Sequence, residues 1–205
     1  MNVFVLGPGR CGSTTFIRAC GHITNYTAGH ETGCYRLGPE RLDFPPHHIE
    51  AGWRLTWFLG RLDEAYGDRA FYVHLARDPE AAARSWAQRF FLSGGMAPAY
   101  RNAILGDAIY RRGISRRDAA IDYIATVEAN IRHFLKDKNH VFPFAVERAE
   151  EDFSRFWEWI GAHGDRDAAL AEWRTRHNSG DSWRGFRRHV RHAARRTWRA
   201  AFPPK

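Results

Sequence analysis

A glycine-rich loop, placed between a short apolar run and a segment with helical spacing, constrains the fold more than any other feature. Residues 2–6, Asn-Val-Phe-Val-Leu, have the composition of a buried strand. The loop that follows reads Gly7-Pro8-Gly9-Arg10-Cys11-Gly12-Ser13-Thr14, and helical spacing runs over residues 12–20. Successive backbone N–H groups of such a loop, together with the helix N-terminus, can hold a phosphate. The sequence therefore predicts a strand, an anion-binding loop and a helix.

The loop departs from the nucleotide P-loop at one position. The spacing from Gly7 through Gly12 to Thr14 is that of a P-loop, but Ser13 stands where the motif has the lysine that reaches the β- and γ-phosphates. An ATPase or GTPase is therefore disfavoured. A cation is still present at Arg10, whose planar guanidinium suits a phosphate or sulfate group. The alternative is a tight turn that binds nothing and leaves Arg10 exposed.

A second strand and helix carry another candidate anion site. Residues 70–76 form a β-type run that ends at Arg77, and Asp78-Pro79-Glu80 has the residues of a helix start. Ser85 follows Arg77 by eight residues, roughly two helical turns into that helix. Arg77 and Ser85 are thus predicted to clamp a phosphate at the carboxyl edge of the sheet. The alternative is a structural ion pair or helix cap.

Strands and helices alternate along the rest of the chain. Further strands are predicted at residues 23–27 and 141–146, an irregular segment at 28–48, and helices at 49–66, 114–135, 153–160 and 168–173. Such alternation is typical of an α/β fold in which helices flank a central, largely parallel sheet in three layers.

Composition narrows the class of protein. With 205 residues, 44% hydrophobic, the chain is long enough for one packed domain, and disordered or collagen-like proteins are excluded. A formal net charge of +8 favours a substrate carrying phosphate, sulfate or carboxylate. Three cysteines, an odd number without metal-type spacing, argue against disulfides and zinc and fit a cytoplasmic location. No apolar run approaches the roughly 20 residues of a membrane span.

The C-terminal segment is a predicted basic amphipathic helix. Apolar residues recur every fourth position over residues 186–202, with arginines between them. We therefore divide the chain into an α/β domain, residues 1–185, and this helix, residues 186–205, packed on the same domain. Peripheral contact with an anionic membrane or an acidic partner is the alternative role.

The two anion-binding segments resemble the two signature elements of sulfotransferases that use 3′-phosphoadenosine 5′-phosphosulfate (PAPS), and the order of elements over residues 2–175 is also similar. The resemblance implies a P-loop-like sulfotransferase fold and transfer of a sulfuryl group to a hydroxyl acceptor, without a metal. It assigns Arg77 and Ser85 to the 3′-phosphate of PAPS. The 5′-phosphosulfate is assigned to Arg10, Cys11, Gly12, Ser13, Thr14 and Thr15, with Cys11 standing where serine is common. The acceptor is left open as a glycan, lipid headgroup, phenol or small metabolite, and no specific nucleic acid is expected.

The resemblance also implies a base. Family members that sulfate glycans or protein tyrosine have a glutamate about twenty residues after the loop cation, and Glu31 occupies that position, with His30 beside it. Other members use histidine, which leaves His30, His47 and His48 as alternatives. If Glu31 is not the base, it is expected to be a loop carboxylate paired to Arg36 or Arg41.

The acceptor pocket and the third donor-binding loop are less defined. Residues 28–48 and 90–113 are the predicted pocket walls. Four aromatic residues are candidates for stacking on the acceptor or for the core, and helical spacing assigns Trp57 to the core; the four are Trp53, Trp57, Trp86 and Tyr100. Two stretches near residues 177–180 and 183–185 are candidates for the third loop.

Two other functions fit parts of the sequence. A P-loop-type small-molecule kinase would share the broad fold but needs an aspartate that holds Mg²⁺ after an apolar strand. A non-enzymatic anion- or RNA-binding module would use the net positive charge and the arginine-rich C-terminal segment.

Overall fold

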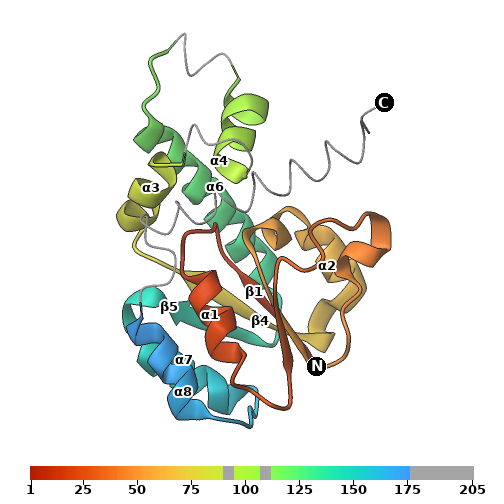
Figure 1. Ribbon diagram of the computed structural model, residues 1–205. Coiled ribbons are helices and arrows are strands. Elements are labelled where there is room, and N and C mark those ends of the chain that lie inside the picture. Colours follow the sequence, from red (N-terminus) through yellow and green to blue (C-terminus); the bar gives the residue numbers. More distant parts are fainter. Residues whose placement is uncertain (90–94, 107–111, 176–205) are drawn as a thin grey trace, which may run out of the picture. The chain divides into compact units, whose positions relative to one another are not determined.

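A parallel sheet forms the centre of the computed structural model, which describes residues 1–89, 95–106 and 112–175. Within these residues five strands pair in the order β2-β3-β1-β4-β5, all parallel (Figure 1). Their bounds are β1 Asn2–Leu6, β2 Thr27–His30, β3 His48–Ala51, β4 Ala70–Ala76 and β5 Val141–Ala145. Every residue of β1 is buried, as in a central strand of a sheet covered on both faces. The predicted α/β class is confirmed.

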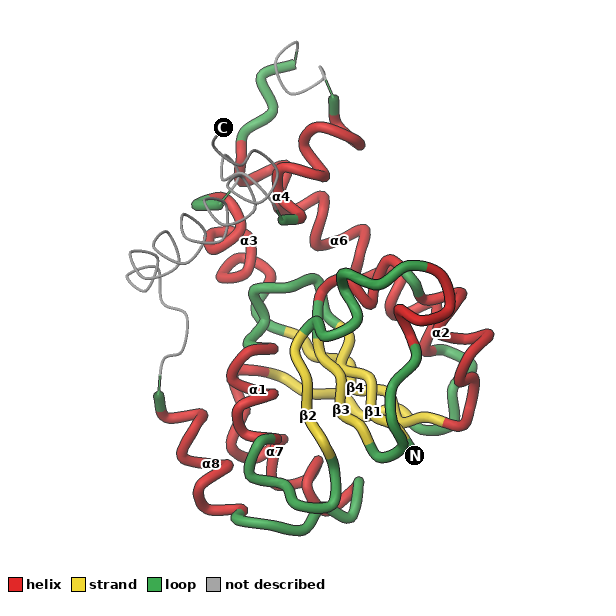
Figure 2. Tube along the Cα trace, turned by 45° about the vertical axis from the view of Figure 1, so that its right-hand side comes forward, coloured by secondary structure: helices red, strands yellow, loops and turns green. Residues whose placement is uncertain are grey.

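Helices cover both faces of the sheet (Figure 2). One face packs against α1 (Ser13–Cys20), α7 (Ala149–Trp159) and α8 (Arg166–Arg174), and the other against α2 (Leu59–Tyr66), α3 (Pro79–Ala87) and α6 (Arg116–Leu135). Side chains of β1 alternate between the two resulting cores, Val3 and Val5 in one and Phe4 and Leu6 in the other. This is the predicted three-layer arrangement.

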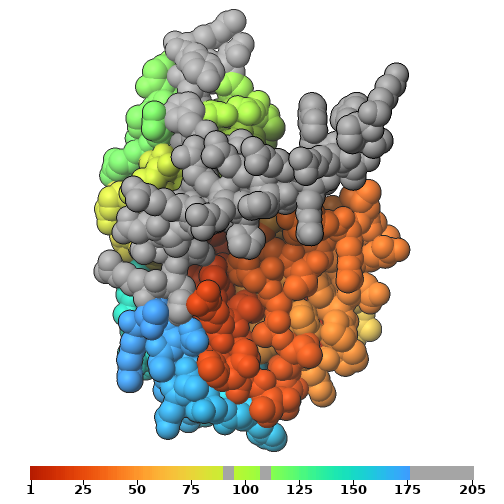
Figure 3. Space-filling view, viewed as in Figure 1, coloured from red at the N-terminus to blue at the C-terminus, as the bar shows by residue number. Residues whose placement is uncertain are grey.

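Aromatic packing fixes α1 on its face. Phe16 is fully buried, and its ring centroid lies 5.2 Å from that of Phe144, 5.6 Å from Phe153 and 5.0 Å from Phe156. The α8 helix packs beside α1, and the two form one continuous surface in the space-filling view (Figure 3). The helix that follows the glycine-rich loop is therefore packed closely against β5, α7 and α8.

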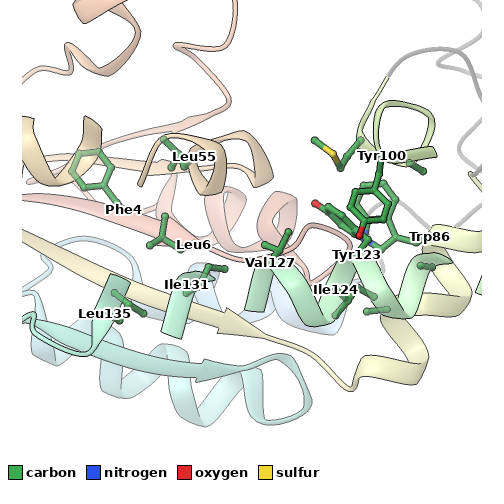
Figure 4. Packing of buried hydrophobic residues seen from close by; sticks show 14 of the residues in the cluster. Phe4, Leu6, Leu55, Trp86, Tyr100, Tyr123, Ile124, Val127, Ile131 and Leu135 are labelled. Atoms are coloured by element: carbon green, nitrogen blue, oxygen red, sulfur yellow. The ribbon is translucent and has the colours of Figure 1, made fainter. Parts of the chain in front are cut away.

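On the opposite face, a row of aliphatic side chains of α6 packs against the sheet (Figure 4). Ile124, Val127, Ile131 and Leu135 are all buried along it. At its N-terminal end Tyr123 donates a hydrogen bond from its hydroxyl to the carbonyl oxygen of Pro8 at 3.0 Å. The core under the sheet thus also anchors the glycine-rich loop.

The strand order places a crevice beside β1. After β1 the chain moves through α1 to β2, on one side of the sheet, and after β4 it moves through α6 to β5, on the other side. The carboxyl ends of β1 and β4, which are neighbours, flank the point where the direction reverses. In open α/β sheets ligands bind at such switch points. The glycine-rich loop and Arg77 follow these two strand ends.

Two sequence predictions need correction. The strand predicted at residues 23–27 lies instead at Thr27–His30, while Ile23 makes only an isolated bridge to Gly164. Residues 49–66 are not one helix: they contain β3, a 3₁₀-helix (Trp53–Trp57) and α2. Every β3 residue is buried, so the strand lacks the alternation of buried and exposed residues that would have indicated it. The helix-like apolar spacing of the residues after it led to the prediction of one helix.

Within the described residues the other predicted helices and strands are confirmed: β1 and β4 have the predicted bounds, and the rest have shifted ends. α6 begins at Arg116 because the Ser115 hydroxyl accepts from the Asp118 N–H at 3.1 Å. α7 and α8 begin earlier than predicted, and β5 tolerates Pro143 because it is an edge strand. Residues Met1–Arg174 form one unit. The predicted boundary after residue 185 and the helix at 186–202 lie outside the described residues.

Removal of the α3 cap is expected to destabilise the fold modestly. The Asp78 carboxylate accepts a hydrogen bond from the Ala81 N–H at 2.8 Å, as the helix-start pattern predicts. Asp78→Ala should lower the free energy of unfolding by about 1 kcal/mol, measured by urea denaturation. Asp137→Ala, at an exposed aspartate in the turn after α6, is the control and should change it by less than about 0.5 kcal/mol. Equal changes in both variants would contradict the capping role.

Candidate functional site

The loop after β1 has three residues with left-handed backbone conformation. Gly9, Arg10 and Gly12 have φ of 80°, 61° and 85°, all in the left-handed region. A Cβ at Gly9 would lie 3.0 Å from Trp86 and 3.1 Å from Trp53, so the backbone passes tightly between two indoles. Gly12 is the N-cap of α1 and has no side-chain cap. Gly12 therefore supplies no side-chain oxygen to accept hydrogen bonds from the first N–H groups of α1.

Three residues predicted to bind the donor come together at the switch point. Arg10 Nε donates to Ser85 Oγ at 2.9 Å, and Arg77 Nη1 donates to the Arg10 carbonyl oxygen at 2.9 Å. They lie on three elements: the loop after β1, the end of β4 and the body of α3. Arg10 and Ser85 are 75 residues apart in sequence. The first and second predicted anion sites therefore adjoin.

Positive charge is concentrated at this point. Burial lowers the pKa of Arg10 to about 10, with further lowering by the positive charges of Arg89 and Arg77. Arg10 nevertheless stays charged at neutral pH. Gathering like charges in a partly buried place costs free energy that a bound anion would offset. Sequence reasoning missed Arg89, which lies in the turn after α3, four residues beyond Ser85.

The other loop residues lie at the start of α1. Cys11 is buried, which raises the pKa of its thiol to about 12, so the thiol stays protonated at neutral pH. Ser13 Oγ lies 3.0 Å from His30 Nε2. Thr14 and Thr15 are half-buried in the first turn of the helix. The loop and the residue that ends β2 are therefore in direct contact.

Glu31 follows β2 at the same edge of the sheet. Its N–H donates to the Ala51 carbonyl oxygen at 3.0 Å, and its φ of 58° is left-handed. Its carboxylate forms an ion pair with Arg54, whose guanidinium also stacks on Trp53 at 4.4 Å from the ring centroid. The alternative interpretation of Glu31, a loop carboxylate paired to Arg36 or Arg41, named the wrong partner: the ion pair is with Arg54, in the 3₁₀-helix after β3.

His30 is held towards its neutral form. Desolvation lowers its pKa below the ordinary 6.5, the negative charge of Glu50 opposes that shift, and the positive charge of Arg54 adds to it. A neutral imidazole with a free electron pair can accept a proton at neutral pH.

Arg54→Gln should raise the pKa of His30, because it removes a positive charge that disfavours the imidazolium. Glu50→Gln should lower that pKa, because it removes the opposing negative charge. Histidine NMR titrations, with the His30 signal assigned by its loss in His30→Gln, measure both. Shifts in the same direction, or none, would contradict this electrostatic description.

The histidine pair is placed away from the loop. His48 is the first residue of β3 and is buried, with Nδ1 2.7 Å from Thr27 Oγ1 and Nε2 3.0 Å from Glu50 Oε2. His47 precedes β3, and its ring packs 5.5 Å from that of Tyr26. Both residues lie at the amino end of the strand, whereas the glycine-rich loop lies at the carboxyl ends. The structure thus separates His47 and His48 from the candidate site.

The aromatic candidates differ in burial. Trp86 and Tyr100 are buried and pack on Tyr123, with ring centroids 5.1 and 5.3 Å from it, so both belong to the core. Trp57 is 47% exposed, and its predicted core position was wrong. It lies in a 3₁₀-helix, where the three-residue turn breaks the face that a four-residue spacing makes in an α-helix. The candidate wall at 90–113 and the third donor loop lie partly or wholly outside the described residues.

Within residues 1–89, 95–106 and 112–175, no group of three or more His, Cys, Asp or Glu side chains is arranged to hold a metal ion. Over the same ranges no helix is long and apolar enough to cross a membrane.

No protein-family model matches the chain, and no curated protein matches it. Among solved structures, the sulfotransferase domain from the curacin biosynthetic pathway superposes with a TM-score of 0.56 at 13% identity, covering 81% of this chain and 75% of that one. Mouse sulfotransferase SULT7A1, complexed with PAP, superposes with a TM-score of 0.53 at 12% identity, covering 84% of this chain and 63% of that one. The fold matches that of these two sulfotransferases. At these identities the likeness establishes the fold alone.

Proposed function

We propose that this chain transfers a sulfuryl group from PAPS to a hydroxyl acceptor. The observation that carries the proposal is the convergence of Arg10, Ser85 and Arg77 at the switch point of a sulfotransferase fold. Arg10 in the glycine-rich loop and the pair of Arg77 and Ser85 lie far apart in the sequence, and most folds would not bring them together. Here they are joined by hydrogen bonds.

The residues present fit the donor nucleotide. Gly9 and Gly12 give the loop the left-handed backbone conformation that it adopts, and the guanidiniums of Arg10, Arg77 and Arg89 supply positive charge. Trp86 Nε1 is buried beside Gly9, and no acceptor is found for it within the described part of the chain. By the resemblance, the loop would hold the 5′-phosphosulfate, and Arg77 with Ser85 the 3′-phosphate. Adjoining anion sites suit one nucleotide that carries both groups.

The chemistry assigns a role to each side chain. PAPS supplies the sulfuryl group, whose bond to the 5′-phosphate oxygen breaks as the acceptor oxygen bonds to sulfur. Arg10 would stabilise the negative charge on the sulfonate and leaving-group oxygens. Glu31 would take the proton of the acceptor hydroxyl, since its carboxylate lies at the same sheet edge as the loop; neutral His30 is the alternative base.

Turnover of PAPS tests the proposal directly. The protein is incubated with PAPS and a panel of phenols, sugars and lipid headgroups, and the release of 3′-phosphoadenosine 5′-phosphate (PAP) is followed by chromatography. We expect acceptor-dependent PAP release that is lost in Arg10→Ala. PAP release that is equal in the variant would overturn the assignment of the loop.

A further inference from the structure

A buried carboxylate next to the candidate base has no role in the chemistry described so far. Glu50, in the middle of β3, is 1% exposed. Its Oε1 accepts from the Thr32 N–H at 2.8 Å, and its Oε2 accepts from the Thr32 hydroxyl at 2.6 Å. Burying a carboxylate is costly unless hydrogen bonds compensate it. Two of its hydrogen bonds go to the residue that follows Glu31.

A side-chain network holds Glu50 from its other side. His48 Nε2 lies 3.0 Å from Glu50 Oε2, and His48 Nδ1 lies 2.7 Å from the Thr27 hydroxyl. Phe44 stacks on the His48 imidazole, with ring centroids 5.2 Å apart and planes 8° apart. The Glu50 carboxylate is therefore held on this side by the His48 side chain, which Thr27 and Phe44 hold in turn.

The loop that Glu50 holds is strained and closely packed. Glu31 is a non-glycine residue with φ of 58°, a conformation that persists only where the surroundings impose it. Two anchors flank it, both on β3: its own N–H bonds to Ala51, and Thr32 bonds to Glu50. Gly29 makes room for this arrangement, because a Cβ there would lie 2.5 Å from Thr32 Cγ2 and 2.8 Å from Glu50 Oε2.

We propose that Glu50 is a positioning residue that clamps Thr32 and thereby sets the direction of the Glu31 carboxylate. The clamp is a property of the fold, but its consequence for catalysis rests on the proposed function. Small displacements of a reacting group lower rates steeply, by roughly 100-fold for about 1 Å. Loss of the clamp should therefore affect turnover and leave donor binding intact.

Thr32 offers the cleaner test, because its side chain is exposed and its replacement should not prevent folding. Thr32→Val removes the hydroxyl that bonds to Glu50 and keeps the side-chain shape, while Thr32→Ser keeps the hydroxyl. Thr24→Val is the matched control, since that hydroxyl donates to the His163 carbonyl oxygen, in a loop at the other end of β2. Each variant is measured for kcat with PAPS, for PAP affinity, and for amide hydrogen exchange over residues 28–36.

Thr32→Val should lower kcat at least about 10-fold, leave PAP affinity unchanged and speed exchange over residues 28–36. Thr32→Ser should keep the kcat and the exchange rate of the unaltered protein. Thr24→Val should change neither kcat nor the exchange over residues 28–36. Unchanged kcat and exchange in Thr32→Val would overturn the proposal, as would an equal loss of PAP affinity. If the unaltered protein does not turn over PAPS but Thr32→Val still speeds exchange, the clamp stands and the proposed function fails.

Discussion

Replacing Arg10 with alanine is expected to weaken the binding of PAP by about 1.5–3 kcal/mol, or roughly 10- to 150-fold. The guanidinium lies at the point where the loop, β4 and α3 meet, and would form charge-assisted hydrogen bonds to the nucleotide. Arg77→Ala should cause a loss of the same size, since it removes the cation of the second anion site. Calorimetric titration with PAP measures both.

Arg61→Ala is the matched control for the arginine variants. Arg61 is exposed on α2, so its removal changes the net charge by the same amount without touching the loop. Its affinity for PAP should equal that of the unaltered protein. If Arg10→Ala and Arg77→Ala also keep that affinity, the two adjoining anion sites do not bind this nucleotide, and the proposed donor is wrong.

Glu31→Gln is expected to lower kcat with PAPS by at least about 100-fold while PAP affinity stays unchanged. Glutamine keeps the size of the side chain and can still hydrogen-bond to Arg54, so the loop should keep its conformation. It cannot accept the proton of an acceptor hydroxyl as a carboxylate does. Initial rates at saturating PAPS give kcat directly.

His30→Gln separates the two candidate bases. If Glu31 is the base, this variant should retain most of the turnover, because His30 then contributes only its contact with Ser13. Near-normal turnover in Glu31→Gln, combined with a large loss in His30→Gln, would transfer the role to the histidine.

The parts of the site that could be predicted from sequence are those built by local residues. The strand, glycine loop and helix at the N-terminus are fixed by neighbours within about fifteen positions, as are β4, Arg77 and the α3 cap at Asp78. Where propensity, glycine placement and capping agree, tertiary structure has little to override. The parallel sheet followed from the alternation of such units.

The parts that could not be predicted depend on contacts between distant segments. All four residues of β3 are buried, so the strand lacks the alternation of buried and exposed residues that indicates a half-buried strand. Its short sequence could therefore not be distinguished from the helix-like stretch that follows. Arg54 pairs with Glu31 only because β2 and β3 are neighbours in the sheet. Glu50 is buried for the same reason, and an isolated glutamate in a short apolar run is usually a surface residue.

Thermal unfolding of the protein with PAP, and separately with ATP and Mg²⁺, tests the central claim most directly. A ligand present at about 100 times its dissociation constant adds about 2.7 kcal/mol to the stability of the folded state. We predict that PAP raises the unfolding temperature, that ATP with Mg²⁺ does not, and that Arg10→Ala loses the PAP effect at the same concentration. Stabilisation by ATP with Mg²⁺ alone, or by neither nucleotide, would contradict a PAPS-dependent sulfotransferase.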